Sequence, residues 1–229
     1  MLLFKGGIAL DKLVRIKDLF NCEVSYIQEL FANCEYPWEI LPKIKEYIKE
    51  LIERGIPGYT LIGKDVLVGE NVKIYETATI EGPTIIGSGT EVRPGAFIRG
   101  AVITGENCVI GNSTEIKNSV LLNKVQVPHY NYVGDSILGN HAHMGAGAVC
   151  SNLKADGKPV VIRGESNIET GLRKIGGILG DGADVGCGCV LNPGTIIGKN
   201  TSVYPLTAVR GVMPQDCIVK AIDNIVKRK

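Results

Sequence analysis

The three histidines of this chain, His129, His141 and His143, are the residues best suited to acid–base chemistry. Imidazole titrates near neutrality, so a positioned histidine can take a proton from a reacting group at physiological pH. His129 lies in the segment 127–135, where Pro128 interrupts strand pairing and predicts a loop. Loops carried on a rigid scaffold often carry function, although a lone histidine is about as often structural. Segment 127–135 is therefore a candidate site.

The scaffold that must position this loop has aliphatic residues repeating every six positions. The first run contains Ile62, Val68, Ile74, Ile80, Ile86, Val92, Ile98, Thr104, Ile110, Ile116 and Leu122. After a phase reset, Leu138 and Met144 form a second run, and a third contains Leu179, Val185, Leu191, Ile197, Val203 and Val209. A period of six fits neither an α-helix nor an ordinary strand, but it fits a short strand plus a corner. The pattern predicts an all-β parallel β-helix over residues 58–214, with handedness left open.

The segments outside this ladder have other patterns. Helical spacing over 24–31 and 41–53 predicts a small α-helical N-terminal extension within residues 1–57. Residues 150–178 interrupt the hexads with a polar, basic inserted loop. Apolar and charged residues alternate at helical spacing over 215–229, which predicts a C-terminal helix that closes the solenoid.

Composition excludes several classes of protein. The chain carries 25 basic and 24 acidic side chains, so it has no basic surface that would favour nucleic acid. No signal-like N-terminus or long apolar run is present, which predicts a cytoplasmic protein without a membrane partner. Seven scattered cysteines, an odd number, do not suggest a disulfide framework.

Several polar motifs resemble a known enzyme family. Glu115-Ile116-Lys117-Asn118-Ser119, residues 127–135 and Met144-Gly145-Ala146-Gly147 resemble the acetyltransferase domain of bifunctional glucosamine-1-phosphate acetyltransferase/N-acetylglucosamine-1-phosphate uridyltransferase. Ser151-Asn152-Leu153, with Asp156, and residues 170–176 more closely resemble its archaeal form, a sugar-1-phosphate nucleotidyltransferase fused to an amino-sugar acetyltransferase. The resemblance spans roughly residues 60–213. It implies a left-handed β-helix, a homotrimer and acetyl-CoA as co-substrate.

The resemblance also implies roles for individual residues. His129 would be the base that takes a proton from the sugar amine, and Asn152 would lie near that amine. The backbone N–H of Ala146 would meet the thioester carbonyl, where a donor stabilises the developing oxyanion. The implied substrate-binding residues are Arg93, Lys117, Tyr132, His143 and Lys158, and the three cations among them would hold the phosphate. The implied coenzyme-binding residues are Ala146, Cys187, Tyr204 and Arg210.

Two departures from the bacterial pattern leave the acceptor open. His143 stands where the bacterial enzyme has an asparagine, and Leu153 stands where it has a tyrosine. The first hypothesis is an N-acetyltransferase acting on glucosamine-1-phosphate or galactosamine-1-phosphate. Alternatives are an acyltransferase for another amine, such as a nucleotide-linked aminosugar, and a non-catalytic trimeric homologue. Residues 1–57 are too short for a uridyltransferase domain, so we expect no nucleotidyltransferase activity.

Metal binding is a weaker alternative. The pairs His141/His143 and Cys187/Cys189 could suggest a ligand set, and some left-handed β-helices are carbonic anhydrases with three zinc-binding histidines. The His-x₄-His spacing of those enzymes is missing here. Cys189 falls on a small inward position of a hexad, which favours a place in the core. We therefore expect no metal.

Overall fold

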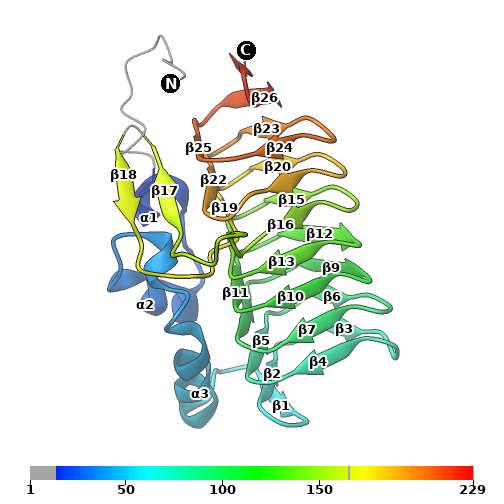
Figure 1. Cartoon of the computed structure of the whole chain (residues 1–229). Coiled ribbons are helices and arrows are strands. Elements are labelled where there is room, and N and C mark those ends of the chain that lie inside the picture. Colours follow the sequence, from blue (N-terminus) through cyan, green and yellow to red (C-terminus); the bar gives the residue numbers. More distant parts are fainter. Residues whose placement is uncertain (1–13, 165, 229) are drawn as a thin grey trace.

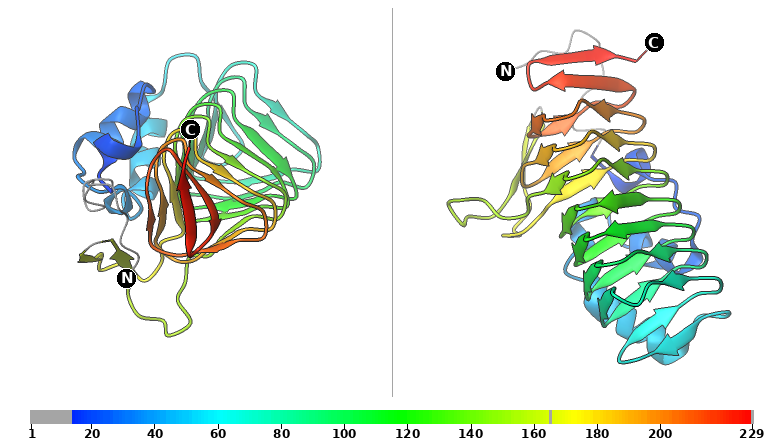
Figure 2. Two further views of the ribbon diagram at one scale, coloured as in Figure 1. Left: turned by 90° about the horizontal axis from the view of Figure 1, so that it is seen from above. Right: turned by 90° about the vertical axis from the view of Figure 1, so that its right-hand side faces the viewer.

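The structure, a computed structural model, describes residues 14–164 and 166–228, so the predicted N-terminal extension is described from residue 14 onward. Its main body is a left-handed β-solenoid of about eight turns whose coils are triangular in section (Figures 1 and 2). Each coil passes through three parallel sheets, A, B and C, in that order. The fold class predicted from the hexads and the resemblance is confirmed.

The strands of the three sheets are short. Sheet A contains β1 (Thr60–Ile62), β2 (Val66–Val68), β5 (Thr84–Ile86), β8 (Val102–Thr104), β11 (Ser119–Leu121), β14 (Ile137–Leu138), β19 (Gly177–Leu179), β22 (Thr195–Ile197) and β25 (Val212–Met213). Sheet B contains β3 (Lys73–Ile74), β6 (Glu91–Val92), β9 (Val109–Asn112), β12 (Gln126–His129), β15 (His143–Met144), β20 (Asp184–Val185), β23 (Ser202–Val203), β26 (Cys217–Ala221) and β27 (Asn224–Lys227). Sheet C contains β4 (Thr79–Glu81), β7 (Phe97–Arg99), β10 (Glu115–Lys117), β13 (Tyr132–Gly134), β16 (Val149–Cys150), β21 (Val190–Leu191) and β24 (Ala208–Val209).

The predicted ladder forms the core, with three corrections. Ile62 is 40% exposed, because β1 runs antiparallel to β2 and caps the open end. Ile74 is 36% exposed and lies outside the core, although it pairs in register with the buried Val92. The phase slips before β11, so Leu121 and not Leu122 stacks between Thr104 and Leu138. Leu122 instead packs with the residues on the outer side of sheet A.

Glycines after the inward aliphatics allow the coils to stack closely. A Cβ at Gly111 would lie only 1.6 Å from the carbonyl oxygen of Pro128 in the next coil. Left-handed backbone conformation occurs elsewhere, for example at Asn107 and Asn200. Asparagine tolerates this conformation better than most residues because its short side chain can bond locally.

The outer face of sheet A is apolar and covered. Its middle residues, such as Ile85 and Ile103, are fully buried against the N-terminal helices (blue in Figure 1). The helices are α1 (Ile16–Leu19), α2 (Ser25–Ala32), the 3₁₀ turn η2 (Pro37–Glu39) and α3 (Ile44–Arg54), and the two longer ones match the predicted segments. The Tyr26 hydroxyl donates to the Thr104 carbonyl oxygen at 3.0 Å, which ties α2 to β8.

The inserted loop leaves the solenoid after β16 and returns at β19. It is more than a loop, because it contains the antiparallel hairpin β17 (Val161–Arg163) and β18 (Asn167–Glu169). Val160 and Ile162 are fully buried in the apolar cluster that also contains the N-terminal helices. We call residues 151–176 the excursion.

The predicted C-terminal helix is wrong. Residues 217–227 form the antiparallel pair β26 and β27, and β26 also pairs with β23. The physical reason is the edge of sheet B, whose backbone groups a strand can satisfy and a helix cannot. Val219 continues the buried core ladder. Among the described residues, no helix is long and apolar enough to cross a bilayer.

Replacing Ile103 by alanine should lower the free energy of unfolding by about 2–5 kcal/mol, because it opens a cavity between sheet A and the helices. Denaturant titration monitored by circular dichroism measures this loss. The exposed Ile222→Ala is the matched control and should change stability by less than about 0.5 kcal/mol. Equal effects of the two changes would contradict the docking of the helices on sheet A.

Candidate active site

His129 stands in a column of residues at the corner between sheets B and C. The N–H of Gly147 donates to the His129 carbonyl oxygen at 3.0 Å, and the N–H of Gly188 donates to that of Ala146 at 2.8 Å. His129, Ala146 and Cys187 therefore lie in successive coils, about 5 Å apart as neighbouring strands are. We call these three residues the His129 corner. The structure thus brings together the predicted base, the predicted oxyanion donor and one predicted coenzyme contact.

Two reactive groups at this corner have no partner in the described chain. The imidazole of His129 is exposed and makes no hydrogen bond there. The backbone N–H of Ala146 also donates to no atom of the described residues. A free base and a free N–H on adjacent coils can serve proton transfer and oxyanion stabilisation.

Asn131, which the sequence analysis missed, holds these two coils together. It is buried, and its Oδ1 accepts from the His129 N–H at 3.1 Å. Its Nδ2 donates to the carbonyl oxygens of Gly145 at 2.8 Å and Ala148 at 3.3 Å. The side-chain amide of Asn131 therefore holds both the backbone of His129 and the turn that contains Ala146. Its position two residues after His129 was the only available signal.

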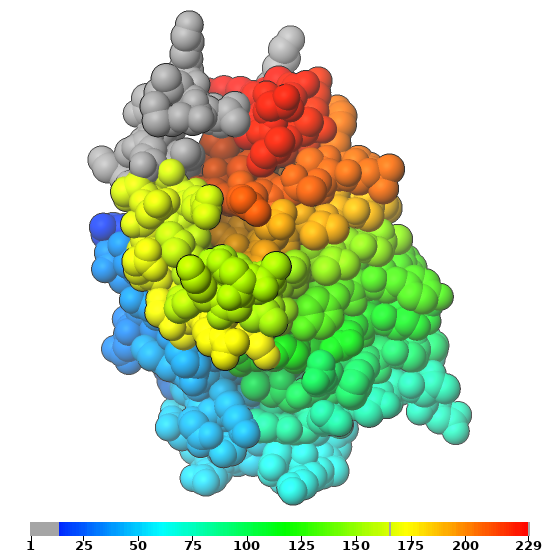
Figure 3. Space-filling view, in the orientation of Figure 1, coloured from blue at the N-terminus to red at the C-terminus, as the bar shows by residue number. Residues whose placement is uncertain are grey.

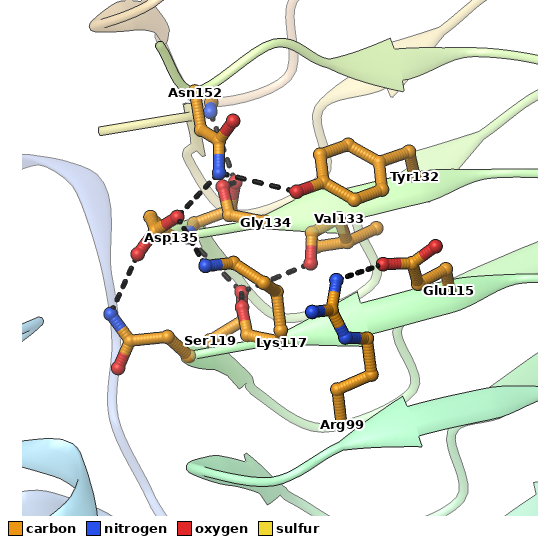
Figure 4. A network of polar contacts seen from close by, with 12 residues as sticks. Arg99, Glu115, Lys117, Ser119, Tyr132, Val133, Gly134, Asp135 and Asn152 are labelled. Atoms are coloured by element: carbon orange, nitrogen blue, oxygen red, sulfur yellow. Dashed lines mark hydrogen bonds and ion pairs between the residues drawn. The ribbon is translucent and has the colours of Figure 1, made fainter. Parts of the chain in front are cut away.

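A second cluster lies at the corner between sheets C and A and centres on the buried carboxylate of Asp135 (Figure 4). Its oxygens lie 3.2 Å from Lys117 Nζ, 2.8 Å from Asn118 Nδ2 and 2.5 Å from Asn152 Nδ2. Asn152 Nδ2 also lies 3.2 Å from the Tyr132 hydroxyl. A buried carboxylate needs such donors and a counter-charge. We call these five residues the Asp135 network.

Gly134 leaves room for the side chains of the Asp135 network. A Cβ at this position would lie 2.6 Å from the Tyr132 hydroxyl oxygen and 2.8 Å from Asn152 Nδ2. The absence of a side chain lets the Tyr132 ring lie along the strand with its hydroxyl at Asn152 (Figure 4). Tyr132, Lys117 and Asn152 are therefore brought together, as predicted. Asp135, their common partner, was not among the predicted site residues.

Arg93 and Lys117 belong to different sheets. Arg93 follows β6 of sheet B and pairs with Glu91 of the same strand at 3.1 Å. The cation beside Lys117 is Arg99, whose Nη1 lies 2.6 Å from Glu115 Oε1 on sheet C (Figure 4). The hydrogen bond that Arg99 donates to the Glu115 carboxylate raises the pKa of the Arg99 guanidinium. Arg99 comes six residues after Arg93, so the hexad phase alone could not tell which sheet each would occupy.

No hydrogen bond or ion pair of the described chain joins the side chains of the other predicted binding residues to either cluster. His143 Nδ1 lies 2.8 Å from Asp184 Oδ1 on sheet B, and Tyr204 is exposed after β23. Lys158 is an exposed residue of the excursion. Arg210 lines a small cavity of about 70 Å³ between the excursion and sheet C, together with Lys154, Val161, Arg163, Asn192, Pro193, Gly194 and Gly211.

Cysteine thiols and possible metal ligands are scattered over the part of the chain that the structure describes. Among residues 14–164 and 166–228, no group of three or more His, Cys, Asp or Glu side chains could hold a metal ion. Cys189 is buried, as its hexad position predicted, and desolvation raises the pKa of its thiol. Burial likewise raises the pKa of Cys150 to about 11. A high thiol pKa leaves little reactive thiolate at neutral pH.

Strand β13 separates the two clusters within one chain. The His129 corner precedes this strand, and Asp135 follows it. Three strand residues span roughly 10 Å. No hydrogen bond or ion pair in the described chain joins the side chain of His129 to the Asp135 network.

Sequence comparison identifies the relatives of this chain. It is 32% identical over 224 residues to a bifunctional protein GlmU of Methanococcus maripaludis, which covers 96% of this chain and 54% of that protein. A bifunctional protein GlmU of Methanococcus aeolicus is 34% identical over 83% of this chain and 55% of its own length. This chain is a homologue of the GlmU proteins. It spans about half the length of these relatives.

Three further matches cover parts of this chain. The family model of the GMPPB C-terminal domain matches residues 80–172. A bifunctional sugar-1-phosphate nucleotidylyltransferase/acetyltransferase of Sulfurisphaera tokodaii is 33% identical over 60% of this GlmU homologue and 38% of that protein. A hexapeptide transferase family protein from Anaplasma phagocytophilum has a TM-score of 0.45 at 15% identity, over 73% of this chain and 86% of that chain.

Replacing Asp135 by alanine should cost about 2–4 kcal/mol of unfolding free energy, because Lys117 and two amides lose their buried acceptor. Denaturant titration measures the cost. Glu115→Ala is the control, since it breaks the exposed pair with Arg99 and should cost about 1 kcal/mol or less. A loss for Asp135→Ala no larger than that of the control would show that the network contributes no stability.

Proposed function

We propose that this GlmU homologue is an acetyl-CoA-dependent N-acetyltransferase that acts on a hexosamine-1-phosphate. The observation that carries the proposal is the His129 corner, where a free imidazole and the free Ala146 N–H lie on adjacent coils. The named relatives, among them a nucleotidylyltransferase/acetyltransferase, support the same chemistry.

The reaction follows from these groups. The sugar amine attacks the carbonyl carbon of the acetyl thioester, and the imidazole of His129 takes the proton that the nitrogen loses. The carbonyl oxygen becomes an oxyanion, which the Ala146 N–H stabilises. Collapse of the tetrahedral intermediate forms the amide bond and breaks the C–S bond. The coenzyme A thiolate leaves and is protonated, so atoms and charge balance.

The acceptor needs the Asp135 network as well. Asn152 is held by Asp135 and lies beside the Tyr132 hydroxyl, so its amide is oriented before substrate arrives. Such pre-organisation places an amine at lower entropic cost. We infer that Asn152 and Tyr132 position the amine of the acceptor.

We further propose a homotrimer, in which the His129 corner of one copy faces the Asp135 network of the next. The two clusters lie at opposite ends of sheet C within one copy. The outer face of that sheet carries the apolar residues Val149 and Val190, and Val190 is 40% exposed. Apolar surface of this kind favours contact with another copy in a closed cyclic assembly.

The coenzyme would extend from the His129 corner. Cys187 lies one coil above Ala146, and Tyr204 is exposed in the following coil. We propose that a phosphate of coenzyme A binds in the cavity lined by Arg210 and Arg163. Guanidinium groups form strong charge-assisted hydrogen bonds to phosphate.

Replacing His129 by alanine should reduce turnover at least about 100-fold, because it removes the general base. The assay is release of free thiol from acetyl-CoA with glucosamine-1-phosphate, galactosamine-1-phosphate or unphosphorylated glucosamine. The melting temperature should stay nearly unchanged, since the imidazole makes no contact within the described chain. Unchanged turnover would remove His129 as the base, and no turnover by the unaltered protein with any acceptor would overturn the proposed function.

A further inference from the structure

A cavity of about 520 Å³ lies beside the Asp135 network. It is lined by Leu41, Pro42, Asn118, Asp135, Leu153, Leu172, Arg173 and Lys174. These residues come from the N-terminal helical segment, the corner between sheets C and A, and the excursion. Figure 3 shows the excursion (yellow) lying against both the N-terminal helices (blue) and the solenoid (green) on this face. We call this cavity the corner pocket.

The corner pocket is contiguous with the proposed acceptor site. Asp135, which lines the pocket, holds the amide of Asn152 at 2.5 Å. Leu153 directly follows Asn152 and also lines the pocket, with 45% of its surface exposed. An acceptor whose amine lies at Asn152 therefore has the pocket next to it for the rest of its structure.

Two cations of the pocket lack an acidic partner. Arg173 donates from Nε to the Gly157 carbonyl oxygen at 3.1 Å, and no carboxylate of the described residues pairs with its guanidinium. The ammonium of Lys174 has no hydrogen bond or ion pair in the described chain. The single carboxylate of the pocket, Asp135, is already paired with Lys117. The pocket thus offers positive charge to an anion.

The cations closer to sheet C are already engaged. Lys117 pairs with Asp135, and Arg99 pairs with Glu115 at 2.6 Å. An anion that used them would have to compete with carboxylates already in place. Arg173 and Lys174 have no paired carboxylate in the described chain with which an anion would have to compete. A charge-assisted hydrogen bond to phosphate is among the stronger polar contacts.

We propose that the corner pocket binds the phosphate-bearing end of the acceptor and that Arg173 and Lys174 are its phosphate contacts. The inference rests on the proposed function for the nature of the acceptor. Leu41 and Leu153 add apolar walls beside these two cations, against which the sugar ring of the acceptor could pack. The class of ligand is an amine-bearing sugar phosphate, as a monoester or a diester.

The test is binding of glucosamine-1-phosphate to the full chain by isothermal titration calorimetry, with inorganic phosphate as a second probe. Lys174→Gln should weaken binding of both probes roughly 10-fold or more, because one charge-assisted hydrogen bond is lost. Arg173→Gln should do the same. Lys45→Gln, an exposed cation on α3 outside the pocket, is the matched control and should leave binding unchanged.

A steric variant tests the pocket without changing its charge. Leu153→Trp should fill the space and weaken binding of glucosamine-1-phosphate more than that of inorganic phosphate, which is smaller. Melting temperatures of all variants check that the fold is kept. If a folded Lys174→Gln and a folded Arg173→Gln both bind within twofold of the unaltered chain, the inference is wrong.

Measuring acetyl transfer distinguishes a failure of this inference from a failure of the proposed function. In steady-state kinetics Lys174→Gln should raise KM for the phosphorylated acceptor and leave KM for unphosphorylated glucosamine unchanged. Acetyl transfer with an unchanged KM in both variants would overturn the pocket alone. Variant-sensitive binding without any acetyl transfer would support the pocket and overturn the proposed function.

Discussion

Hydrogen bonding from each coil to the next is the constraint on which the rest of this structure depends. Apart from the antiparallel end strands β1 and β27, the strands of the solenoid pair in parallel with their equivalents one coil away, so residues at one corner must stack in columns. The close approach leaves no room for a Cβ at Gly111. The same stacking places His129, Ala146 and Cys187 in one line although 58 residues separate the first from the last. The alignment of successive coils therefore positions these site residues, and the inserted excursion adds further residues beside the solenoid.

The hexad period was sufficient to predict this register in outline. The strand register from Val68 to Ile116 follows this period, because a six-residue rung is imposed by the triangular coil, although Ile74 in the first coil is partly exposed. The period could not predict the slip to Leu121, because a five-residue rung keeps an aliphatic at both candidate positions. Nor could it assign a residue to one of three equivalent sheets, so it gave no check on Arg93, which the resemblance grouped with Lys117, and it did not point to Arg99. The C-terminal strands were mistaken for a helix because a short alternating segment fits both periods.

Partners of charged groups were beyond the reach of the sequence. The predicted cation Lys117 is present and near Asn152, but Asp135 holds both. Hydrogen-bond partners depend on which side chains the corner brings together, and no spacing rule gives that. The N-terminal helices show the same limit. Their periodicity predicted helices, whereas their place over the apolar outer face of sheet A follows only from three-dimensional packing.

The central claim is that the His129 corner of one copy works with the Asp135 network of the next, and subunit complementation tests it most directly. His129→Ala and Asn152→Ala chains would be purified, shown to be inactive alone, then unfolded together in equal amounts and refolded. A shared site predicts recovery of roughly a quarter of wild-type thiol release, because about three quarters of random trimers are mixed and each holds one intact site in three. Mixed trimers with no activity would contradict the account, since they would place both clusters of a working site in one chain.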